Sequence, residues 1–437
     1  MSNIALVVLD TLRKDYFDKH FDWLPGQRFE HAYSTANWTI PAHASLFTGK
    51  YASEVGVHSK NMYLDCDEPV LAEQLQRAGY TTRAFSANTN ASGHFDFDRG
   101  FTEFGAPDKM EHLNDDRIFE WRKFNRETDK EGVEKYLNAL YECYRDDTAT
   151  IPSLVKGFQL IREGGNPTEY GGAAEALEHV QETDFGDQEF LFINVMEAHE
   201  PYRVPPEYAS VSEPDLTDSV GDISVSGMDP EQTKQAYDDC ARYLSDIYKK
   251  IFGRLQEDFD YVITLSDHGE SLGEHDAWGH EYGVYPELIH VPLTISGDGL
   301  SGVSEASVSI LDVHATIQDI AGLEGDSRGR SLLEEVDDEE FLAEYQGLTS
   351  WSEEKLAENG YEDQIPAYDQ KLHGYVAPVD FYGYETQNGF RTTGTEEVSD
   401  AEERMQTLID QLKTREVSQD NDVPDEIKDR LEDLGYA

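Results

Sequence analysis

The sequence predicts an α/β fold, with a mostly parallel sheet flanked by helices on both faces and a smaller C-terminal antiparallel α+β subdomain. Unbroken apolar runs at residues 4–9 and 190–195 are typical of strands that are buried on both faces of a parallel sheet. Strand and helix patterns alternate up to about residue 320, and this β-α-β order favours parallel strands. Beyond about residue 325 the side chains alternate with a period of two, which indicates antiparallel strands.

The elements of the main sheet follow from apolar spacing and from the glycine or proline residues at their ends. In chain order we expect a strand at 4–9, a helix near 41–48 closed by Gly49, a helix at 69–78 ended by Gly79, strands at 80–86 and 190–195, an amphipathic helix at 229–257 and a strand at 259–265. Residues 110–185 are highly charged, and we expect a helical insertion there.

The C-terminal part has a different pattern. The segments FLAEYQGL and HGYVAPVDFYGYETQNGFRTT supply the expected antiparallel strands, and charged helices are expected near 399–415 and 424–434. At 437 residues the chain exceeds a typical single domain. We therefore expect a main domain at 1–325 and a small subdomain at 326–437.

The net charge is strongly negative along the whole chain. The sequence has 35 Lys and Arg residues against 89 Asp and Glu residues, which gives a formal net charge of -54. This charge argues against nucleic acid or an anionic membrane as a partner. At roughly 1 M salt the Debye length is about 3 Å, so the repulsion between surface charges is largely screened. We therefore predict a halophilic protein of a high-salt cytosol; the alternative is an ordinary acidic mesophilic protein.

Three further features favour a cytoplasmic protein. The opening residues MSNIALVVLD have no basic region before an apolar core, so we expect no secretory signal. No stretch approaches the roughly 18 apolar residues that cross a bilayer, so we expect no stable membrane insertion. The cysteines Cys66, Cys143 and Cys240 lie far apart, and we expect free thiols in a reducing compartment.

Acidic and imidazole side chains follow the ends of the expected buried strands. Asp10 comes directly after the first strand, Asp267 and His268 follow strand 259–265, and His199 lies shortly after run 190–195. The carboxyl ends of parallel strands share one edge, where ligands bind. These side chains are therefore candidates to surround a metal ion or a reacting group. The alternative is a set of strand-end turns with solvated side chains.

Thr39 is the candidate nucleophile. Pro41 suits the first turn of a helix and Gly49 its C-terminal cap, so Thr39 is expected at or just before a helix N-terminus. Unpaired N–H groups and the positive end of the helix dipole favour an anion there, which lowers the cost of a threonine alkoxide. The alternative is that Thr39 serves only as an N-cap.

Several motifs in the same order resemble the sulfatase branch of the alkaline phosphatase superfamily. They are Asp10, the pattern T-x-P-x-H-x-S-L-x-T-G from Thr39 to Gly49, the pattern S-D-H-G-E-x-x-G-E-H from Ser266, and the later W-G-H and V-P-L. The closing KDRLEDLGYA also resembles the end of many such chains. The resemblance covers roughly residues 1–325. It implies an alkaline phosphatase-like fold with a metal-dependent catalytic domain over this range, and an ester hydrolase activity.

The resemblance also implies the ligands of one divalent metal ion. Asp10, Asp267 and His268 would bind it, with the oxygen of Thr39 as the fourth protein contact. Carboxylate oxygens suit Ca, Mg or Mn, and the imidazole shifts the preference towards Mn or Zn. The metal is therefore one of Ca, Mn, Mg or Zn.

Three histidines are further candidates for catalysis. His199, in the stretch MEAHEPY, would donate to the substrate or the leaving group, unless it only braces the turn at Pro201. His280 stands where sulfatases usually carry Lys, and could still donate a proton or a hydrogen bond. His43 would add positive charge, unless it merely packs on its own helix. Arg13 is considered for the same role, with an ordinary surface residue as the alternative.

The nucleophile position departs from the sulfatase pattern. Sulfatases carry Cys or Ser there, followed by Pro-Ser-Arg, and convert that residue to formylglycine. Thr39 has a secondary alcohol that cannot be oxidised to this aldehyde, so no formylglycine is expected. The pattern T-x-P-x-H resembles instead the nucleotide pyrophosphatase and phosphodiesterase relatives, which use a threonine nucleophile and two zinc ions. The additional Asp of their second zinc site has no assigned counterpart here.

Three functions remain compatible with these residues. The favoured one is hydrolysis of a phosphate or phosphonate ester through a covalent threonine intermediate, on a small-molecule or glycan substrate. The second is transfer of a phospho-alcohol group to a glycan or lipid acceptor. The third is sulfate ester hydrolysis without formylglycine. A purely binding protein would leave the metal-binding pattern without a use. The oligomeric state stays open.

Overall fold

The computed structural model describes residues 2–107, 170–214, 229–334 and 339–417, apart from single positions within and between these ranges. The described residues up to 105 and from 170 onward belong to one compact unit. Most of the helical insertion expected at 110–185, and the whole helix expected near 424–434, lie outside the described residues. The boundary expected at residue 325 stays a prediction.

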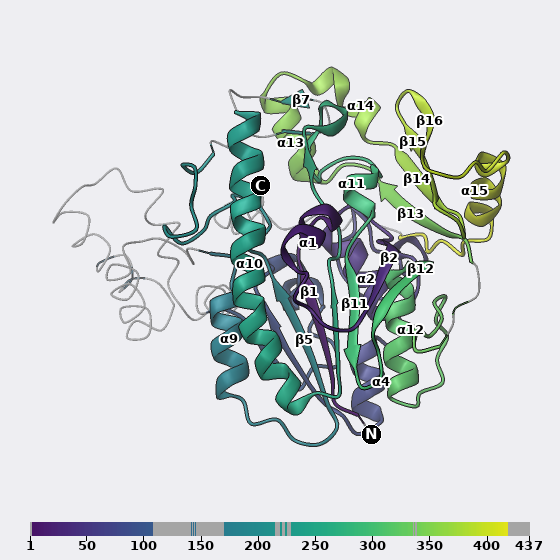
Figure 1. The fold of residues 1–437 in the computed structure, drawn as a ribbon. Coiled ribbons are helices and arrows are strands. Elements are labelled where there is room, and N and C mark those ends of the chain that lie inside the picture. Colours follow the sequence, from purple (N-terminus) through teal and green to yellow (C-terminus); the bar gives the residue numbers. More distant parts are fainter. Residues whose placement is uncertain are drawn as a thin grey trace. The chain divides into compact units, whose positions relative to one another are not determined.

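The main sheet has eight strands in the order β12-β2-β11-β8-β1-β5-β3-β4 (Figure 1). Strands β8, β1, β5, β3 and β4 run parallel to one another, and β12 runs parallel to β2; β11 is antiparallel to both of its neighbours. The bounds are β1 Ile4–Leu9, β2 Gln27–Tyr33, β3 Thr81–Ser86, β4 Glu103–Gly105, β5 Glu189–Val195, β8 Tyr261–Leu265, β11 Leu293–Gly297 and β12 Gly302–Ser309.

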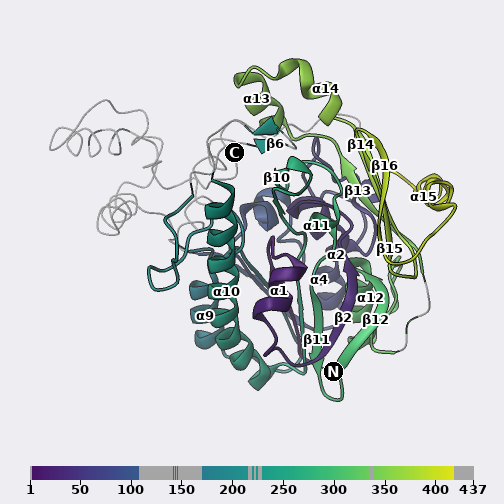
Figure 2. The same cartoon turned by 45° about the horizontal axis from the view of Figure 1, so that its top comes forward.

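Helices cover both faces of this sheet, as Figures 1 and 2 show. Helix α10 packs against α9 and α1 on one face, and α2 packs against α12 and α4 on the other. The bounds are α1 Lys14–His20, α2 Thr39–Thr48, α3 Ala52–Val55, α4 Leu71–Arg77, α9 Ala173–Glu182, α10 Pro230–Asp258, α11 Pro286–Ile289 and α12 Ile310–Ile320. The predicted α/β class, with helices on both faces, is confirmed.

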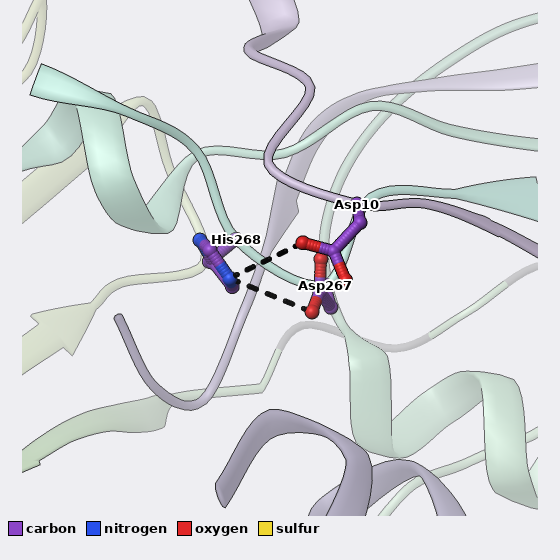
Figure 3. A group of neighbouring side chains, drawn as sticks. All are labelled: Asp10, Asp267 and His268. Carbon is purple, nitrogen blue, oxygen red and sulfur yellow. Dashed lines mark ion pairs between the residues drawn. The ribbon is translucent and has the colours of Figure 1, made fainter. Parts of the chain in front are cut away.

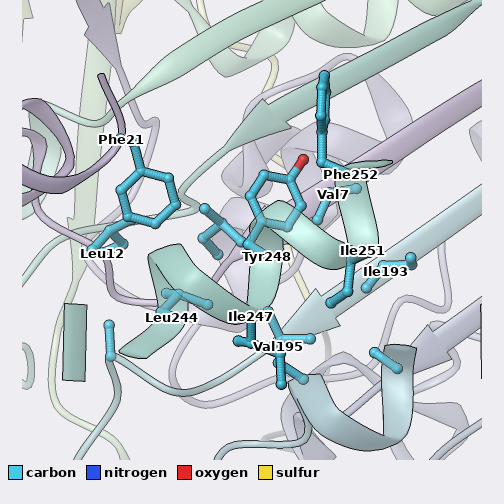
Figure 4. Close-up of a cluster of buried hydrophobic side chains, with 14 of the residues drawn as sticks. Val7, Leu12, Phe21, Ile193, Val195, Leu244, Ile247, Tyr248, Ile251 and Phe252 are labelled. Atoms are coloured by element: carbon cyan, nitrogen blue, oxygen red, sulfur yellow. The ribbon is translucent and has the colours of Figure 1, made fainter. Parts of the chain in front are cut away.

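The core between the sheet and α10 fixes the strand ends that carry the site (Figure 4). Val7 of β1 and Ile193 of β5 pair in register, and both pack in one buried cluster with Leu244 and Ile251 of α10. Burying each such side chain stabilises the fold by about 1.5–3 kcal/mol. Because β1 and β5 are held in this register, Asp10 follows directly alongside the end of β5.

A second, antiparallel sheet follows the main one, in the order β13-β14-β15-β16. The backbone N–H of Glu344 in β13 donates to the carbonyl of Thr35 at 2.8 Å, which ties this sheet to the loop before α2. The bounds are β13 Phe341–Gln346, β14 Lys371–Val376, β15 Phe381–Thr386, β16 Gly389–Gly394, α13 Ser350–Glu358, α14 Ile365–Tyr368 and α15 Ala401–Asp410. The predicted C-terminal antiparallel α+β part is confirmed.

Short strand pairs complete the described structure. They are β6 Ser219–Val220 with β7 Ile223–Ser224, and β9 Ser271–Leu272 with β10 Trp278–Gly279. Among the described residues, none of the helices has the length and apolar character needed to span a membrane.

Candidate active site

Asp10, Asp267 and His268 meet at the carboxyl edge of the main sheet (Figure 3). Asp10 follows β1, and the other two follow β8, which is the parallel neighbour of β1. All three side chains are fully buried, and one ligand atom from each lies within 4.8 Å of the others. The Nε2 atom of His268 is 3.8 Å from Asp10 Oδ1 and 3.5 Å from Asp267 Oδ2. Sheet topology therefore brings residues 257 positions apart into one group.

Thr39 joins this group through its hydroxyl. It is the first residue of α2, and Trp38, not Thr39, occupies the N-cap position. The Oγ1 atom of Thr39 lies 3.4 Å from His268 Nε2 and accepts a hydrogen bond of 3.1 Å from Asn88 Nδ2. The hydroxyl thus points to the acidic group, at the end of the helix where the dipole is positive.

Two carboxamides orient the carboxylate of Asp10. Asn88, just beyond β3, donates from Nδ2 to Asp10 Oδ2 at 2.7 Å, and Asn194 of β5 donates to the same oxygen at 3.2 Å. The Thr11 hydroxyl donates to Asp10 Oδ1 at 2.8 Å. Such outer contacts fix the direction of metal-binding carboxylates. Four parallel strands therefore contribute to the site: β1, β3, β5 and β8.

The donor set fits a divalent cation. Atoms that bind one ion at about 2.1 Å lie roughly 3–4 Å from each other, which is the range of the His268 distances. His268 places Nδ1 2.9 Å from the carbonyl of Gly269, so Nδ1 carries the proton and Nε2 is left with its lone pair towards the carboxylates. Among the described residues, Asp267 Oδ2 has no hydrogen-bond donor although it is fully buried. A cation would satisfy this oxygen.

The electrostatics of the Asp10, Asp267 and His268 group also favour a bound cation. Burial and the nearby negative charge of Asp10 raise the pKa of Asp267 well above its usual value. Burial, followed by the charge of His280, lowers the pKa of His268 well below its usual value, so the imidazole is neutral. Two buried carboxylates this close together cannot both ionise without a counter-charge. A bound cation would supply that charge.

His43 lies beneath the nucleophile within α2. Its Nδ1 donates to the backbone carbonyl of Thr39 at 2.9 Å, and its Nε2 accepts from Asn194 Nδ2 at 3.2 Å. Nδ1 also lies 3.5 Å from Asp267 Oδ2. Burial lowers the pKa of His43, so it is neutral. The ring therefore braces the start of α2 and contacts two residues of the acidic group.

His199 and His280 form a second group of imidazoles next to the first. Their ring centroids are 5.0 Å apart, and the ring of His280 is 4.6 Å from that of His268. His199 Nδ1 lies 2.8 Å from the carbonyl of Glu200, and His280 Nδ1 is 3.0 Å from Glu270 Oε1. Burial alone would lower the pKa of His280, but the Glu270 carboxylate outweighs it and raises the value to about 10. His280 is therefore a cation.

Arg13 has its charge engaged by acidic partners. Its guanidinium pairs with Asp15 at 2.9 Å and with Glu274 at 3.0 Å, and Nη1 also donates to the carbonyl of Glu270. Its side chain is buried except for 9% of its surface. The arginine therefore holds the loop that carries Glu270 and Glu274. It does not behave as an ordinary surface residue.

Sequence reasoning gave little or no weight to three residues of the site. Asn194 lies within the apolar run FLFINV, where a single polar residue inside a buried strand is itself a signal. Asn88 follows a buried strand, but a carboxamide in that place is common in turns. Glu270 stands in the S-D-H-G-E motif, and only the structure shows that it contacts His280.

The fold, together with the match to a family model, is that of an ester hydrolase of the alkaline phosphatase superfamily. The sulfatase family model matches residues 3–323. The chain therefore belongs to the sulfatase family.

Individual relatives share part of the chain at modest identity. The choline-sulfatase of Rhizobium meliloti is 25% identical over 371 residues, which cover 74% of this chain and 68% of the relative. The low-salt glycan biosynthesis sulfotransferase Agl7 of Haloferax volcanii is 34% identical over 128 residues, which cover 26% of this chain and 30% of the relative. The phosphonate monoester hydrolase of Silicibacter pomeroyi is similar in fold, with a TM-score of 0.59, 19% identity and 94% of each chain covered.

Proposed function

We propose that the protein is a metal-dependent hydrolase of phosphate or phosphonate esters, with Thr39 as its nucleophile and a covalent threonine ester as its intermediate. One observation carries the proposal: the Thr39 hydroxyl lies at the Asp10, Asp267 and His268 group, 3.4 Å from His268 Nε2. The position of Thr39 at the N-terminus of α2 supports it, because that helix end favours an anionic oxygen.

Asp10, Asp267, His268 and the Thr39 oxygen would hold the metal, which is Ca, Mn, Mg or Zn. When bound, a divalent metal stabilises the alkoxide and the charge on the oxygens of the transferred group. Formylglycine is not part of the proposal, because a secondary alcohol cannot be oxidised to an aldehyde.

The reaction has two displacements. The hydroxyl proton of Thr39 leaves to water, and the bond from Oγ1 to phosphorus forms while the bond from phosphorus to the leaving oxygen breaks. Asn88 donates to Oγ1 and orients it. His199 donates a hydrogen bond to the leaving oxygen, and the His280 cation gives that oxygen its proton. Water then attacks phosphorus and gives a proton back to His280, while the bond from phosphorus to Oγ1 breaks and Oγ1 takes up a proton from solvent to restore Thr39.

Phosphorus is favoured over sulfur at the reacting centre. A plain alcohol nucleophile with a metal serves phosphoryl transfer, whereas the sulfatases that the motifs resemble use formylglycine. Hydrolysis of sulfate esters without formylglycine is the alternative within this family. The substrate is a small-molecule or glycan ester.

Transfer to an acceptor alcohol is a second candidate. It is favoured by the likeness, over 128 residues, to a relative that is named a sulfotransferase of glycan biosynthesis. The same Thr39 ester would then be released by an acceptor alcohol in place of water.

One assay tests these alternatives together. Purified protein with added Mn²⁺ in molar KCl is given aryl phosphate diesters, phosphate monoesters, phosphonate esters and sulfate esters. The proposal expects turnover of a phosphorus ester, and loss of turnover in Thr39→Ala with metal binding still measurable. Unchanged turnover in that variant would remove Thr39 from the mechanism. Product formed only when an alcohol is added would show transfer.

The working environment proposed is a high-salt cytoplasm. The net charge of -54 supports it, because molar salt screens this self-repulsion.

A further inference from the structure

Thr11 forms a strained turn between β1 and α1. Its φ angle is 63°, in the left-handed region that β-branched residues rarely adopt, and the residue is fully buried. Such a conformation raises the free energy of the folded state, and it persists only where the surrounding structure enforces it. Strained residues of this kind cluster at functional sites. The contacts of Thr11 therefore show what enforces the turn and what depends on it.

Thr11 is hydrogen-bonded to both carboxylates of the candidate metal site. Its hydroxyl donates to Asp10 Oδ1 at 2.8 Å, and its backbone N–H donates to Asp267 Oδ1 at 3.3 Å. The other oxygen of Asp267, Oδ2, has no donor among the described residues and lies 3.5 Å from His268 Nε2. Because both bonds come from one residue, the backbone conformation of Thr11 fixes the position of one carboxylate relative to the other. It also leaves Asp267 Oδ2 directed at the space where a cation would bind.

Tyr237 of α10 holds this turn. Its hydroxyl donates to the backbone carbonyl of Thr11 at 2.7 Å and accepts from the backbone N–H of Arg13 at 2.9 Å. The residue is fully buried, and its ring packs edge-on against Tyr202, with ring centroids 5.4 Å apart. Buried backbone groups need hydrogen-bond partners, and this one hydroxyl serves two of them. Tyr237 therefore stabilises the turn in its strained conformation.

The side chain of Arg13 ties the same turn to the loop after β8. Its Nη1 atom donates to the backbone carbonyl of Glu270 at 3.0 Å and also pairs with Glu274 at 3.0 Å. A continuous set of contacts thus runs from α10 through residues 11–13 to the loop that carries Asp267. The relative position of the two strand ends depends on this turn as well as on the pairing of β1 with β8.

We propose that Thr11 and Tyr237 are positioning residues for the metal site. Tyr237 holds Thr11 in the strained turn, and Thr11 holds the Asp10 and Asp267 carboxylates at the separation that one divalent cation bridges. The inference rests on the proposed function, because that function places a cation at these carboxylates. Hydrogen bonds to metal-binding carboxylates orient them and raise the affinity of the site. The strain at Thr11 is therefore offset by a preorganised pair of ligands.

Calorimetric titration of the full chain measures this effect without turnover. The wild type is titrated with Ca²⁺, Mg²⁺, Mn²⁺ and Zn²⁺ in molar KCl, which suppresses binding to surface charges, and the tightest cation is used for the variants. Thr11→Val keeps the β-branched shape without the hydroxyl and should weaken binding about tenfold. Thr11→Ser keeps the hydroxyl and should stay within about threefold of the wild type. Tyr237→Phe should weaken binding about two- to tenfold, because it removes both hydrogen bonds to the turn.

Tyr248→Phe is the matched control for Tyr237→Phe. Tyr248 lies on the same helix and is fully buried, and its hydroxyl bonds Thr264 Oγ1 at 2.5 Å. The control should lower the Tm of the metal-free protein as Tyr237→Phe does, but leave the cation affinity unchanged. A role of Tyr237 in folding alone would leave the affinity unchanged in both variants.

The possible failures are distinguishable. Wild-type affinity in Thr11→Val or in Tyr237→Phe, or an equal loss of affinity in Tyr248→Phe, would overturn the positioning role while the metal site stands. A wild type that binds none of the four cations would overturn the metal site, and the role of both residues with it.

Discussion

The Asn88 carboxamide links the nucleophile to the acidic group, and replacing it with alanine tests how Thr39 is held. Its Nδ2 donates to Thr39 Oγ1 at 3.1 Å and to Asp10 Oδ2 at 2.7 Å. Asn194 offers a matched comparison, because its Nδ2 reaches the same Asp10 oxygen at 3.2 Å but bonds His43 in place of Thr39. Both residues are fully buried. The two alanine variants therefore differ chiefly in the contact with the nucleophile.

The expected magnitudes follow from the charge on each acceptor. A hydrogen bond to a charged group contributes about 1.5–3 kcal/mol, so loss of the bond to the Thr39 alkoxide should lower kcat about 10- to 150-fold. Loss of an outer contact to a metal ligand typically weakens metal binding about tenfold or more. Asn88→Ala should show both effects. Asn194→Ala should show only the second, with kcat at saturating metal within about threefold of wild type.

Steady-state kinetics on an aryl phosphate ester over a Mn²⁺ titration would separate the two effects. The metal dependence gives the apparent affinity, and the plateau gives kcat. Equal kcat losses in the two variants would show that Asn88 acts only through Asp10. An unchanged kcat in Asn88→Ala would refute the reasoning altogether.

The remaining predictions concern the nucleophile, the metal, pH and salt. Thr39→Val, which keeps the shape without the hydroxyl, should lower kcat by roughly 10⁴-fold or more, whereas Thr39→Ser should keep measurable turnover; comparable rates in both would count against a covalent role. Calorimetry should show that Mn²⁺ raises the Tm of wild type but not of Asp267→Asn, and an equal rise in both would place the metal elsewhere. His314 has no partner for either ring nitrogen among the described residues, and burial lowers its pKa to about 3 from 6.5. Below about pH 6.5 the unfolded chain therefore binds a proton at His314 that the folded protein does not bind. The free energy of unfolding consequently falls as the pH falls, by about 2 kcal/mol between pH 7 and pH 5. In denaturant unfolding, the free energy of unfolding of His314→Phe should fall less than that of the wild type between pH 7 and pH 5, by the same amount. An equal fall in both proteins would exclude His314 as the cause. Thermal melts should shift upward from dilute buffer to molar KCl, and equal stability in both would contradict a halophilic protein.

The parallel strands β1, β3, β5 and β8 were predictable from the sequence, whereas the parallel strand β4 and the strands β11, β2 and β12 on the other side of β8 in the main sheet were not. Strands β1 and β5 are buried on both faces, so their sequences are continuous apolar runs. Strands β2 and β12 carry polar residues on partly exposed faces, as in QRFEHAY and GVSEASVS, and give no comparable signal. The antiparallel direction of β11 depends on its neighbours β2 and β8, which no local pattern encodes.

The site was predictable where its residues stand at strand ends or in motifs. Asp10, Asp267 and His268 follow buried strands, and topology alone brings such ends together. The partners of a side chain were not predictable in the same way. The position of Arg13 beside the first strand gives no sign that Asp15 and Glu274 neutralise it. The contact of Glu270 with His280 likewise depends on how a loop folds back, which sequence spacing does not fix.

Mass spectrometry of the acid-quenched enzyme tests the central claim most directly, because a covalent intermediate leaves a mark on one residue. Wild-type protein is mixed with a slowly hydrolysed aryl phosphate ester and Mn²⁺, quenched during turnover and digested. The peptide that contains Thr39 should gain the mass of the transferred group, and the gain should be absent in Thr39→Val. Turnover without any modified Thr39 peptide, or a group found on another residue, would contradict the account.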